Sequence, residues 1–289
     1  MAAQSESRFA PRAFRWTVPA MILHFSHANG FPAACYRKMF SHVERDFEIK
    51  YVNTIGHDPR HPVTDSWPHL VAELIEHLER HREPVLGVGH SLGGYLTALA
   101  ALKRPALFRA IILLDSPILG RRQGMMFKMI KRFGLADRVT PAGATRDRRA
   151  EWASADEAYT HFRNRKTFLH FDPECLRDYV TLGTVPSPHG VRLAFDPAIE
   201  SRIYRTFPHG LAGELPNLRV PAGFICGRES AEARRVGLST TRRHFRLVRI
   251  PGGHLFPFER PEAAALAIRE MAAELMRTGG SERGKLHPE

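Results

Sequence analysis

The chain has 289 residues, 43% of them hydrophobic and 25% charged, with a formal net charge of +12. This length and apolar content suit one domain with a full hydrophobic core and room for an inserted subdomain, and no apolar run is long enough for a membrane-spanning helix. Most of the basic residues are scattered arginines without a nucleic-acid-binding motif, so we expect no nucleic-acid partner.

The two ends of the chain and its cysteines bear on location. Residues 1–13 and 279–289 are polar and are predicted to be tails, and the first of them lacks the apolar stretch of a signal peptide. Cys35, Cys175 and Cys226 are odd in number, far apart and not in metal-ligand spacing, so we expect reduced structural thiols. These features predict a cytoplasmic protein, and they leave its oligomeric state open.

Six short apolar segments are typical of strands buried on both faces of a sheet. They are rich in β-branched and aliphatic residues and are flanked by turn-forming residues. In chain order they span residues 20–26, 47–53, 85–89, 110–115, 222–227 and 245–250. Segments with helical spacing of apolar residues lie between them, at 67–82, 92–104 and 261–277. This alternation predicts an α/β fold with a mostly parallel central sheet flanked by helices.

The alternation stops between about residues 121 and 213, where the pattern is mainly helical and is broken by prolines. We predict that residues 14–120 and 214–278 form the α/β core. The intervening residues 121–213 are predicted to form a helical cap, or lid, over the carboxyl edge of the sheet.

The sequence Gly89-His90-Ser91-Leu92-Gly93 is the central functional signal. It follows a predicted strand and precedes a predicted helix, the context in which G-x-S-x-G forms a sharp turn that projects the serine from the sheet edge. The two glycines remove side chains that would collide in such a turn. The pattern therefore predicts Ser91 as a nucleophile, with amides at the start of the next helix facing the reacting oxygen.

Three further segments follow predicted strands. They are residues 27–32 (His-Ala-Asn-Gly-Phe-Pro), 56–58 (Gly-His-Asp) and 251–257 (Pro-Gly-Gly-His-Leu-Phe-Pro). Together with Ser91, in this order, they resemble the α/β-hydrolase fold superfamily, within it a serine esterase with a helical cap. Residues 27–32 are similar to the family's histidine-glycine oxyanion loop, with Ala28 where glycine is usual. The resemblance covers nearly the whole chain apart from the insertion and the tails.

The resemblance implies roles for individual residues. His254 would take the proton from Ser91 and later deliver it to the leaving group, because a neutral serine is a poor nucleophile. The backbone amides of Asn29 and Leu92 would form the oxyanion hole. His27 and Phe31, in the loop that contains Asn29, are expected substrate contacts. No cofactor is implied.

The acid that orients His254 has two candidates. Most relatives carry an aspartate in a G-x-x-D pattern after the next-to-last strand, where residues 227–230 here read Gly-Arg-Glu-Ser, so Glu229 stands one position early. Some bacterial esterases of the superfamily place the acid on an earlier strand, and Asp115 ends such a strand on the expected edge with Ser91. We favour Asp115 and keep Glu229 as the alternative. Their non-catalytic interpretations are a turn cap and a surface ion pair, respectively.

His57, Asp58 and His61 could imitate a metal site, but the family loop explains them better, and we expect no metal. Residues 124–139 form an amphipathic pattern that includes Met125 and Met129, with lysines and an arginine on its polar face. Three interpretations stay open for this pattern. It is a lid that lines an acyl pocket, a contact with an anionic membrane, or a cap helix that only packs on the core.

These observations predict a carboxylesterase-like serine hydrolase that cleaves a small-molecule ester through an acyl-enzyme. Fold and triad do not separate an esterase from a thioesterase, a lactonase or a carbon–carbon bond hydrolase. A hypothesis of another class is a non-catalytic ligand receptor on a hydrolase scaffold, which predicts saturable binding without turnover.

Overall fold

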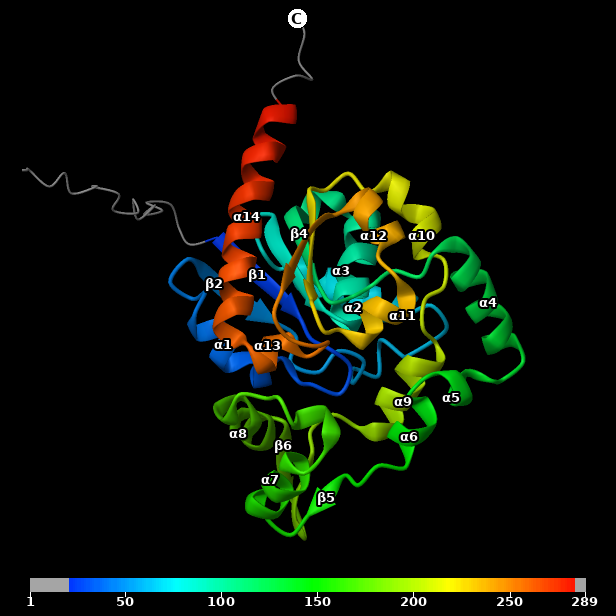
Figure 1. Cartoon of the computed structure of the whole chain (residues 1–289), viewed down its shortest axis with the longest axis vertical. Coiled ribbons are helices and arrows are strands. Elements are labelled where there is room, and N and C mark those ends of the chain that lie inside the picture. The colour runs from blue at the N-terminus through cyan, green and yellow to red at the C-terminus, as the bar shows by residue number, and fades with distance from the viewer. Residues whose placement is uncertain (1–20, 284–289) are drawn as a thin grey trace, which may run out of the picture.

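The computed structural model describes residues 21–283, and six parallel strands form its central sheet in the order β2-β1-β3-β4-β8-β9 (Figure 1). All six predicted strands are confirmed, with ends that shift by no more than two residues. The strands are β1 (Met21–Ser26), β2 (Phe47–Tyr51), β3 (Val85–His90), β4 (Phe108–Leu114), β8 (Ala222–Gly227) and β9 (Arg246–Ile250). The predicted tail at 1–13 and core residues 14–20 lie outside the described residues.

Helices cover both faces of this sheet, because the side chains of each strand alternate between them. On β4, Ala110, Ile112 and Leu114 belong to one core cluster, and Ile111 and Leu113 belong to the other. The first cluster includes side chains of α1 and α14, and the second includes side chains of α2 and α3. The core helices are α1 (Arg37–Ser41), α2 (Pro68–Leu78), α3 (Leu92–Lys103), α11 (Ala231–Val236), α12 (Ser239–His244), α13 (Phe256–Glu259) and α14 (Pro261–Arg283).

The carboxyl-terminal helix α14 is longer than its sequence pattern predicts. It continues to Arg283, so the first part of the predicted tail at 279–289 is helical, and residues 284–289 lie outside the described residues. None of the helices between residues 21 and 283 is long and apolar enough to cross a lipid bilayer.

The chain between β4 and β8 forms helices and a second, three-stranded antiparallel sheet in the order β5-β7-β6. The sequence pattern here indicated mainly helices and did not predict this sheet, because its strands are just two to four residues long and carry no clear alternation. Its elements are α4 (Arg121–Arg132), α5 (Ala136–Val139), α6 (Ala142–Arg146), β5 (Glu151–Trp152), α7 (Ala155–Arg163), α8 (Pro173–Leu182), β6 (Thr184–Ser187), β7 (Gly190–Leu193), α9 (Pro197–Arg205) and α10 (Leu211–Glu214). Short 3-10 turns span Ala33–Tyr36, Pro105–Leu107, Lys166–Phe168 and Leu215–Asn217.

This inserted segment packs against the loop that follows β1. The Tyr179 hydroxyl donates a hydrogen bond to the carbonyl of Gly30 at 3.3 Å, and Asn29 Nδ2 donates to the carbonyl of Glu200 at 3.0 Å. The ring of Phe31 lies 5.1 Å from that of Tyr179 and 5.2 Å from that of Phe258, centroid to centroid. These contacts fix the insertion over the carboxyl end of β1, which is the edge where β3 also ends.

Candidate active site

Ser91 lies in a tight turn between β3 and α3. Its backbone has φ 53° and ψ −111°, a conformation that L-residues rarely adopt, and its amide donates to the carbonyl of Leu114 at 3.0 Å. A Cβ on Gly89 would come 2.3 Å from the carbonyl oxygen of Gly93, and a Cβ on Gly93 would come 2.0 Å from that of Ser26. The two glycines are therefore required by close backbone approach.

A hydrogen-bonded chain joins Ser91, His254 and Asp115. The Ser91 Oγ lies 3.1 Å from Nε2 of His254, and Nδ1 of His254 lies 2.7 Å from Oδ2 of Asp115. Because a carboxylate can only accept, Nδ1 carries the proton, and Nε2 of the neutral ring is free to accept from the serine hydroxyl. This tautomer is the one that a general base for Ser91 requires.

Asp115 follows the last residue of β4 and is fully buried, with a positive φ of 40°. Its Oδ1 accepts from the amide of Gly227 at 3.2 Å, and its Oδ2 also accepts from the Ser230 hydroxyl at 2.5 Å. Ser230 in turn caps α11, because its Oγ accepts from the amide of Ala233. The sequence reasoning did not assign Ser230, although the serine where an aspartate is usual was the signal that could have found it.

The alternative acid Glu229 faces away from this chain. It is exposed, and its Oε2 accepts from the amide of Gly252 at 2.6 Å. The structure therefore brings Asp115, and not Glu229, to the imidazole of His254. A second carboxylate that sequence reasoning missed, Glu232, lies with its Oε2 3.8 Å from Nδ1 of His254.

The surroundings of His254 favour its charged form. Burial by itself would lower the pKa of His254, but the hydrogen bond and charge of Asp115, together with the charges of Glu232 and Glu259, raise it above the ordinary 6.5. The side chain keeps 21% of its surface exposed, whereas Asp115 keeps none. An imidazolium formed here would thus be held by an adjacent buried carboxylate.

A second, buried histidine connects the two loops around Ser91. The amide of Ala28 donates to the Tyr36 hydroxyl, which donates to Nδ1 of His90 at 2.7 Å, and Nε2 of His90 donates to the carbonyl of His254 at 2.9 Å. Burial lowers the pKa of His90 to about 3, so the ring stays neutral and the direction of this chain is fixed. His90 therefore holds the backbone of His254 and the hydroxyl of Tyr36, and both of its ring nitrogens are used in these two contacts.

The amides of Asn29 and Leu92 have the properties expected of oxyanion donors. Among the described residues, neither donates a hydrogen bond to another protein group. The amide of Gly93 donates to the carbonyl of His27 at 3.1 Å, which ties the turn after Ser91 to the loop that contains Asn29. Leu92 also opens α3, so its amide belongs to the positive end of that helix.

His27 is fully buried and both of its ring nitrogens have protein partners. Nε2 accepts from the amide of Ile55 at 2.8 Å, and Nδ1 donates to the carbonyl of Ala28 at 2.9 Å. Burial lowers the pKa of His27 to about 4. The ring thus fixes the loop between β1 and the 3-10 turn, and it leaves no nitrogen for the substrate contact that we expected.

A buried ion pair lies beside this loop, and sequence reasoning did not find it. Arg148 Nη2 lies 2.5 Å from Oε2 of Glu200, whose side chain is 8% exposed. Burial raises the pKa of Glu200 to about 7, and the charge of Arg148 opposes that rise. Since Glu200 also accepts from Asn29 through its backbone carbonyl, the pair braces the loop from the insertion side.

The other predicted substrate contacts are Phe31, Met125 and Met129. Phe31 is half-buried in the aromatic cluster with Tyr179 and Phe258. Met125 and Met129 lie on α4 with 62% and 42% of their surface exposed. They line a hollow of about 490 Å³ to which none of the three residues of the hydrogen-bonded chain contributes.

The three residues whose spacing resembles a metal site, His57, Asp58 and His61, each contact a different protein group. His57 Nε2 accepts from the amide of Asp196, His61 Nε2 bonds to Glu76, and Asp58 pairs with Arg60. Within residues 21–283 one cluster brings three possible ligand atoms within 4.8 Å of one another, formed by Asp115, Glu232 and His254. The 2.7 Å between Asp115 and His254 is a hydrogen-bond distance, shorter than the ~3.3 Å between two ligands of a tetrahedral zinc ion.

The three cysteines are free and buried, as predicted. Burial raises the pKa of Cys175 and Cys226 to about 12, so neither thiol is a nucleophile at neutral pH.

Comparison with known proteins agrees with the fold. One curated relative, ethanol acetyltransferase 1 of Hanseniaspora uvarum, is 27% identical over 107 residues, which are 36% of this chain and 32% of that protein. The match thus spans about a third of that relative's length. Among solved structures, E-2-(acetamidomethylene)succinate hydrolase superposes with a TM-score of 0.67 at 21% identity, covering 88% of this chain and 91% of its own. The thioesterase domain from the curacin biosynthetic pathway superposes with a TM-score of 0.66 at 17% identity, covering 88% and 93%.

A family model also matches most of the chain. The model of the alpha/beta hydrolase family matches residues 23–267, from the first strand to the last helix, and so includes Ser91, Asp115 and His254. Since this span exceeds half of the chain and the sheet has the parallel order described above, the chain belongs to the alpha/beta hydrolase family.

Proposed function

We propose that this protein is a serine hydrolase that cleaves carboxylic esters of small molecules through an acyl-enzyme intermediate. The observation that carries the proposal is the continuous chain of hydrogen bonds from Ser91 Oγ through His254 to Asp115, at 3.1 Å and 2.7 Å. A serine, a histidine and a buried carboxylate in this geometry are what nucleophilic acyl transfer needs.

In the acylation step, Ser91 Oγ attacks the ester carbonyl carbon while Nε2 of His254 takes the hydroxyl proton. The carbonyl oxygen becomes an oxyanion, and the amides of Asn29 and Leu92 would donate hydrogen bonds to it. Each donor of this kind raises the reaction rate by about 10²–10³-fold. The carbon–oxygen bond to the alcohol then breaks, and the imidazolium returns its proton to the leaving alcohol. Asp115 stabilises the imidazolium throughout and keeps its own charge.

In the deacylation step, a water molecule takes the place of the alcohol. The oxygen of the water attacks the acyl carbon while His254 removes a proton from the water. His254 then returns that proton to Ser91 Oγ as the acyl–serine bond breaks. The products are a carboxylic acid and the free enzyme. The same residues suffice for a thioester, since only the leaving group differs.

An ester is the substrate that we propose first, and neither the residues of the site nor the relatives distinguish it from a thioester or a lactone. The structural neighbours named above act on different bonds, and at 21% identity and below their likeness concerns the fold alone. A thioester, a lactone and a carbon–carbon bond are therefore the substrates to compare with the ester. We also propose a cytoplasmic location, as the sequence predicts.

The decisive experiment is labelling with a fluorophosphonate probe, read by intact mass and by peptide mapping. We expect one adduct on Ser91, absent in Ser91→Ala and strongly slowed in His254→Ala. Ser116→Ala is the matched control, because Ser116 is a buried serine near the turn whose Oγ donates to Leu114 and which has no role in the proposed chemistry. A labelled Ser91 justifies an ester, thioester and lactone panel.

The receptor hypothesis makes the opposite prediction. A folded protein that binds ester analogues saturably, takes no probe at Ser91 and turns over no member of the panel would overturn the enzyme proposal. Circular dichroism of the same sample shows that the protein used was folded.

A further inference from the structure

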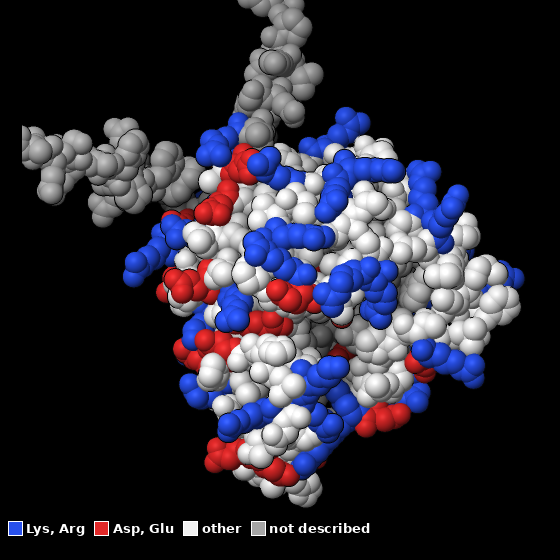
Figure 2. Space-filling model, in the orientation of Figure 1, with Lys and Arg blue, Asp and Glu red and all other residues white. Residues whose placement is uncertain are grey.

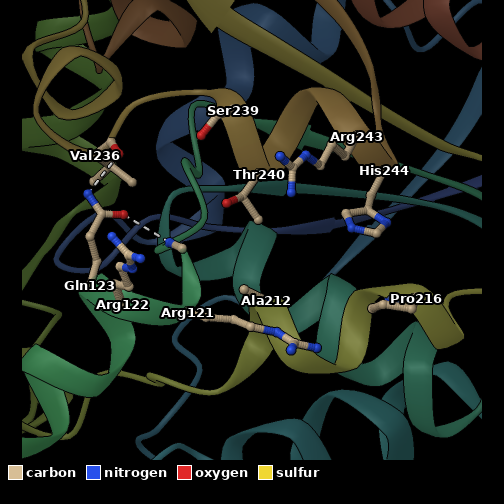
Figure 3. Close-up of a pocket in the computed structure, with 11 residues that line it drawn as sticks. Arg121, Arg122, Gln123, Ala212, Pro216, Val236, Ser239, Thr240, Arg243 and His244 are labelled. Carbon is tan, nitrogen blue, oxygen red and sulfur yellow. Dashed lines mark hydrogen bonds between the residues drawn. The ribbon is translucent and has the colours of Figure 1, made fainter.

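A hollow of about 880 Å³ lies between the start of α4, α10 and α12, outside the proposed active site (Figure 3). None of Ser91, Asp115 and His254 contributes to it. The lining residues are Gly120, Arg121, Arg122, Gln123, Ala212, Pro216, Val236, Ser239, Thr240, Arg243 and His244.

The residues that line this hollow carry positive charge, and no acidic residue among them balances it. Three arginines line it, Arg121, Arg122 and Arg243, and no acidic residue does. Within residues 21–283 none of these three guanidinium groups forms an ion pair, although other arginines of the chain do. Figure 2 shows several Lys and Arg side chains over the part of the surface where Figure 1 has α10 and α12.

The cationic side chains come from different elements and face a common space. In Figure 3, Arg121 of α4 and Arg243 of α12 approach from opposite sides, with Thr240 and Ala212 between them. Hydrogen bonds fix the wall on the α4 side, because Gln123 Nε2 donates to the carbonyl of Val236 at 2.9 Å and Gln123 Oε1 accepts from the amide of Gly120 at 2.9 Å. The start of α4 and the end of α11 are thus held together before any ligand binds.

The size and chemistry of the hollow define a ligand class. Its volume falls in the range of about 300–1,000 Å³ that holds small organic molecules, and it is far larger than an inorganic ion needs. Guanidinium groups bind phosphate oxygens through paired hydrogen bonds, and several cations match the near −2 charge of a phosphate monoester better than that of a single carboxylate. The hydroxyls of Ser239 and Thr240 add donors, and Ala212, Pro216 and Val236 suit an organic moiety.

We propose that this hollow is a binding site for a phosphate-bearing organic ligand. The ligand's phosphate lies between Arg121 and Arg243, and its organic part rests on the apolar residues of α10 and the following turn. The phosphate can belong to a free small molecule or to a lipid headgroup. The second source is included because the neighbouring side chains Met125, Met126 and Met129 of α4 are exposed apolar groups.

The test is isothermal titration of the full chain at an ionic strength of about 0.15 M, where exposed charges are screened, with adenosine diphosphate and with pyrophosphate, and with adenosine as the uncharged analogue. We expect saturable binding of the two phosphate probes and none of adenosine. The double variant Arg121→Gln/Arg243→Gln should raise the dissociation constant about tenfold or more, since two charge-assisted contacts are lost.

The matched control is Arg138→Gln/Arg242→Gln, which removes the same charge from exposed arginines that do not line the hollow. It should leave the dissociation constant within about twofold, because screened charges outside the site contribute only long-range attraction. Fluorophosphonate labelling of both double variants at the wild-type rate separates this proposal from the proposed function.

A second arm compares vesicles of phosphatidylcholine with and without phosphatidic acid. Binding of phosphatidic acid vesicles alone, lost in Arg121→Gln/Arg243→Gln, supports the site and identifies a lipid headgroup as its ligand. Equal weakening in the two double variants, or no binding to either phosphate probe and to either vesicle, overturns the proposal.

Discussion

The Ser230 hydroxyl donates a 2.5 Å hydrogen bond to Oδ2 of Asp115, the same oxygen that accepts from Nδ1 of His254. Ser230 stands where most relatives carry the acid, and Asp115 reaches that point from the end of a different strand. Asp115 follows β4 and Ser230 follows the neighbouring strand β8, so the two strand ends meet beside His254. The proposed acid follows the first strand, and the hydroxyl that donates a hydrogen bond to it follows the second.

Replacing the acid tests this arrangement directly. Asp115→Asn should lower kcat by about 10³–10⁴-fold, because the amide cannot hold the Nδ1-protonated tautomer or the imidazolium. Glu229→Gln is the matched control and should change kcat less than about threefold, since its Oε1 can still accept from Gly252. Steady-state hydrolysis of an ester taken from the panel measures both. A larger loss in Glu229→Gln than in Asp115→Asn would contradict the assignment.

A carboxylate placed at position 230 should partly replace the carboxylate of Asp115. In the double variant Asp115→Asn/Ser230→Asp, a carboxylate starts from the position that most relatives use, beside the space where Oδ2 of Asp115 now lies. We expect kcat at least about tenfold above that of Asp115→Asn, because the imidazolium regains a nearby negative charge. The single variant Ser230→Ala is the reference for the lost helix cap, which costs about 1 kcal/mol of unfolding free energy. No recovery in the double variant would mean that the backbone at Ser230 cannot direct a carboxylate to His254.

The pH dependence follows from the raised pKa of His254. The base acts in its neutral form, so kcat/KM should fall as the pH drops through that pKa, with a midpoint above 6.5. Glu232→Gln should move the midpoint to lower pH, because one of the charges that raise the pKa is removed, and Glu229→Gln should leave it in place. Rate profiles between pH 5 and 9 check this, and a midpoint that does not respond to Glu232→Gln would argue against an electrostatic role for that carboxylate.

The raised pKa of His254 also determines how the free energy of unfolding changes with pH. A histidine whose pKa is higher in the folded than in the unfolded state stabilises the fold fully below its unfolded value, and this contribution is lost as the pH rises through the folded value. The difference in unfolding free energy between wild type and His254→Ala should therefore decrease from pH 6 to pH 9. Urea unfolding at several pH values measures it, and a difference that grows with pH would contradict the direction of the shift.

Gly30 should be intolerant of any side chain. It has φ +80°, and a Cβ there would come 2.6 Å from Oε1 of the buried Glu200. Gly134→Ala is the matched control, because Gly134 has φ +68° and a Cβ added there would meet nothing within 4 Å, so it should cost about 1 kcal/mol for the backbone alone. Gly30→Ala should cost about 1–3 kcal/mol more, since Glu200 must move from Arg148.

Urea denaturation of the two glycine variants gives the comparison. Gly30→Ala should also lower kcat, because the amide of Asn29 directly precedes the altered residue. Equal unfolding free energies and an unchanged kcat would mean that the loop and Glu200 adjust without cost.

The sequence by itself determined the sheet and the turn that contains the proposed nucleophile, Ser91. Strands buried on both faces are apolar along their length, and the strand from Val85 ends in a pentapeptide whose glycines are dictated by contacts within the turn. Ser91 and His254 follow the strands β3 and β9, and parallel strands of one sheet end at one edge, so the sequence also placed these two residues on the same edge. These are local features, and a local pattern is enough to predict them.

Tertiary structure alone decided how the neighbours of that site are used. His27 lies in the loop that contains Asn29, yet its two ring nitrogens bond to Ile55 and Ala28, because a buried polar atom without a partner costs free energy. Glu200 and Arg148 meet beside Gly30 only because the insertion folds back over β1, and β5 pairs with β7 although Glu151 and its partner Arg192 lie far apart in the sequence. The choice of Asp115 over Glu229 was of the same kind, since both carboxylates follow strands on one edge and only the direction of each side chain separates them.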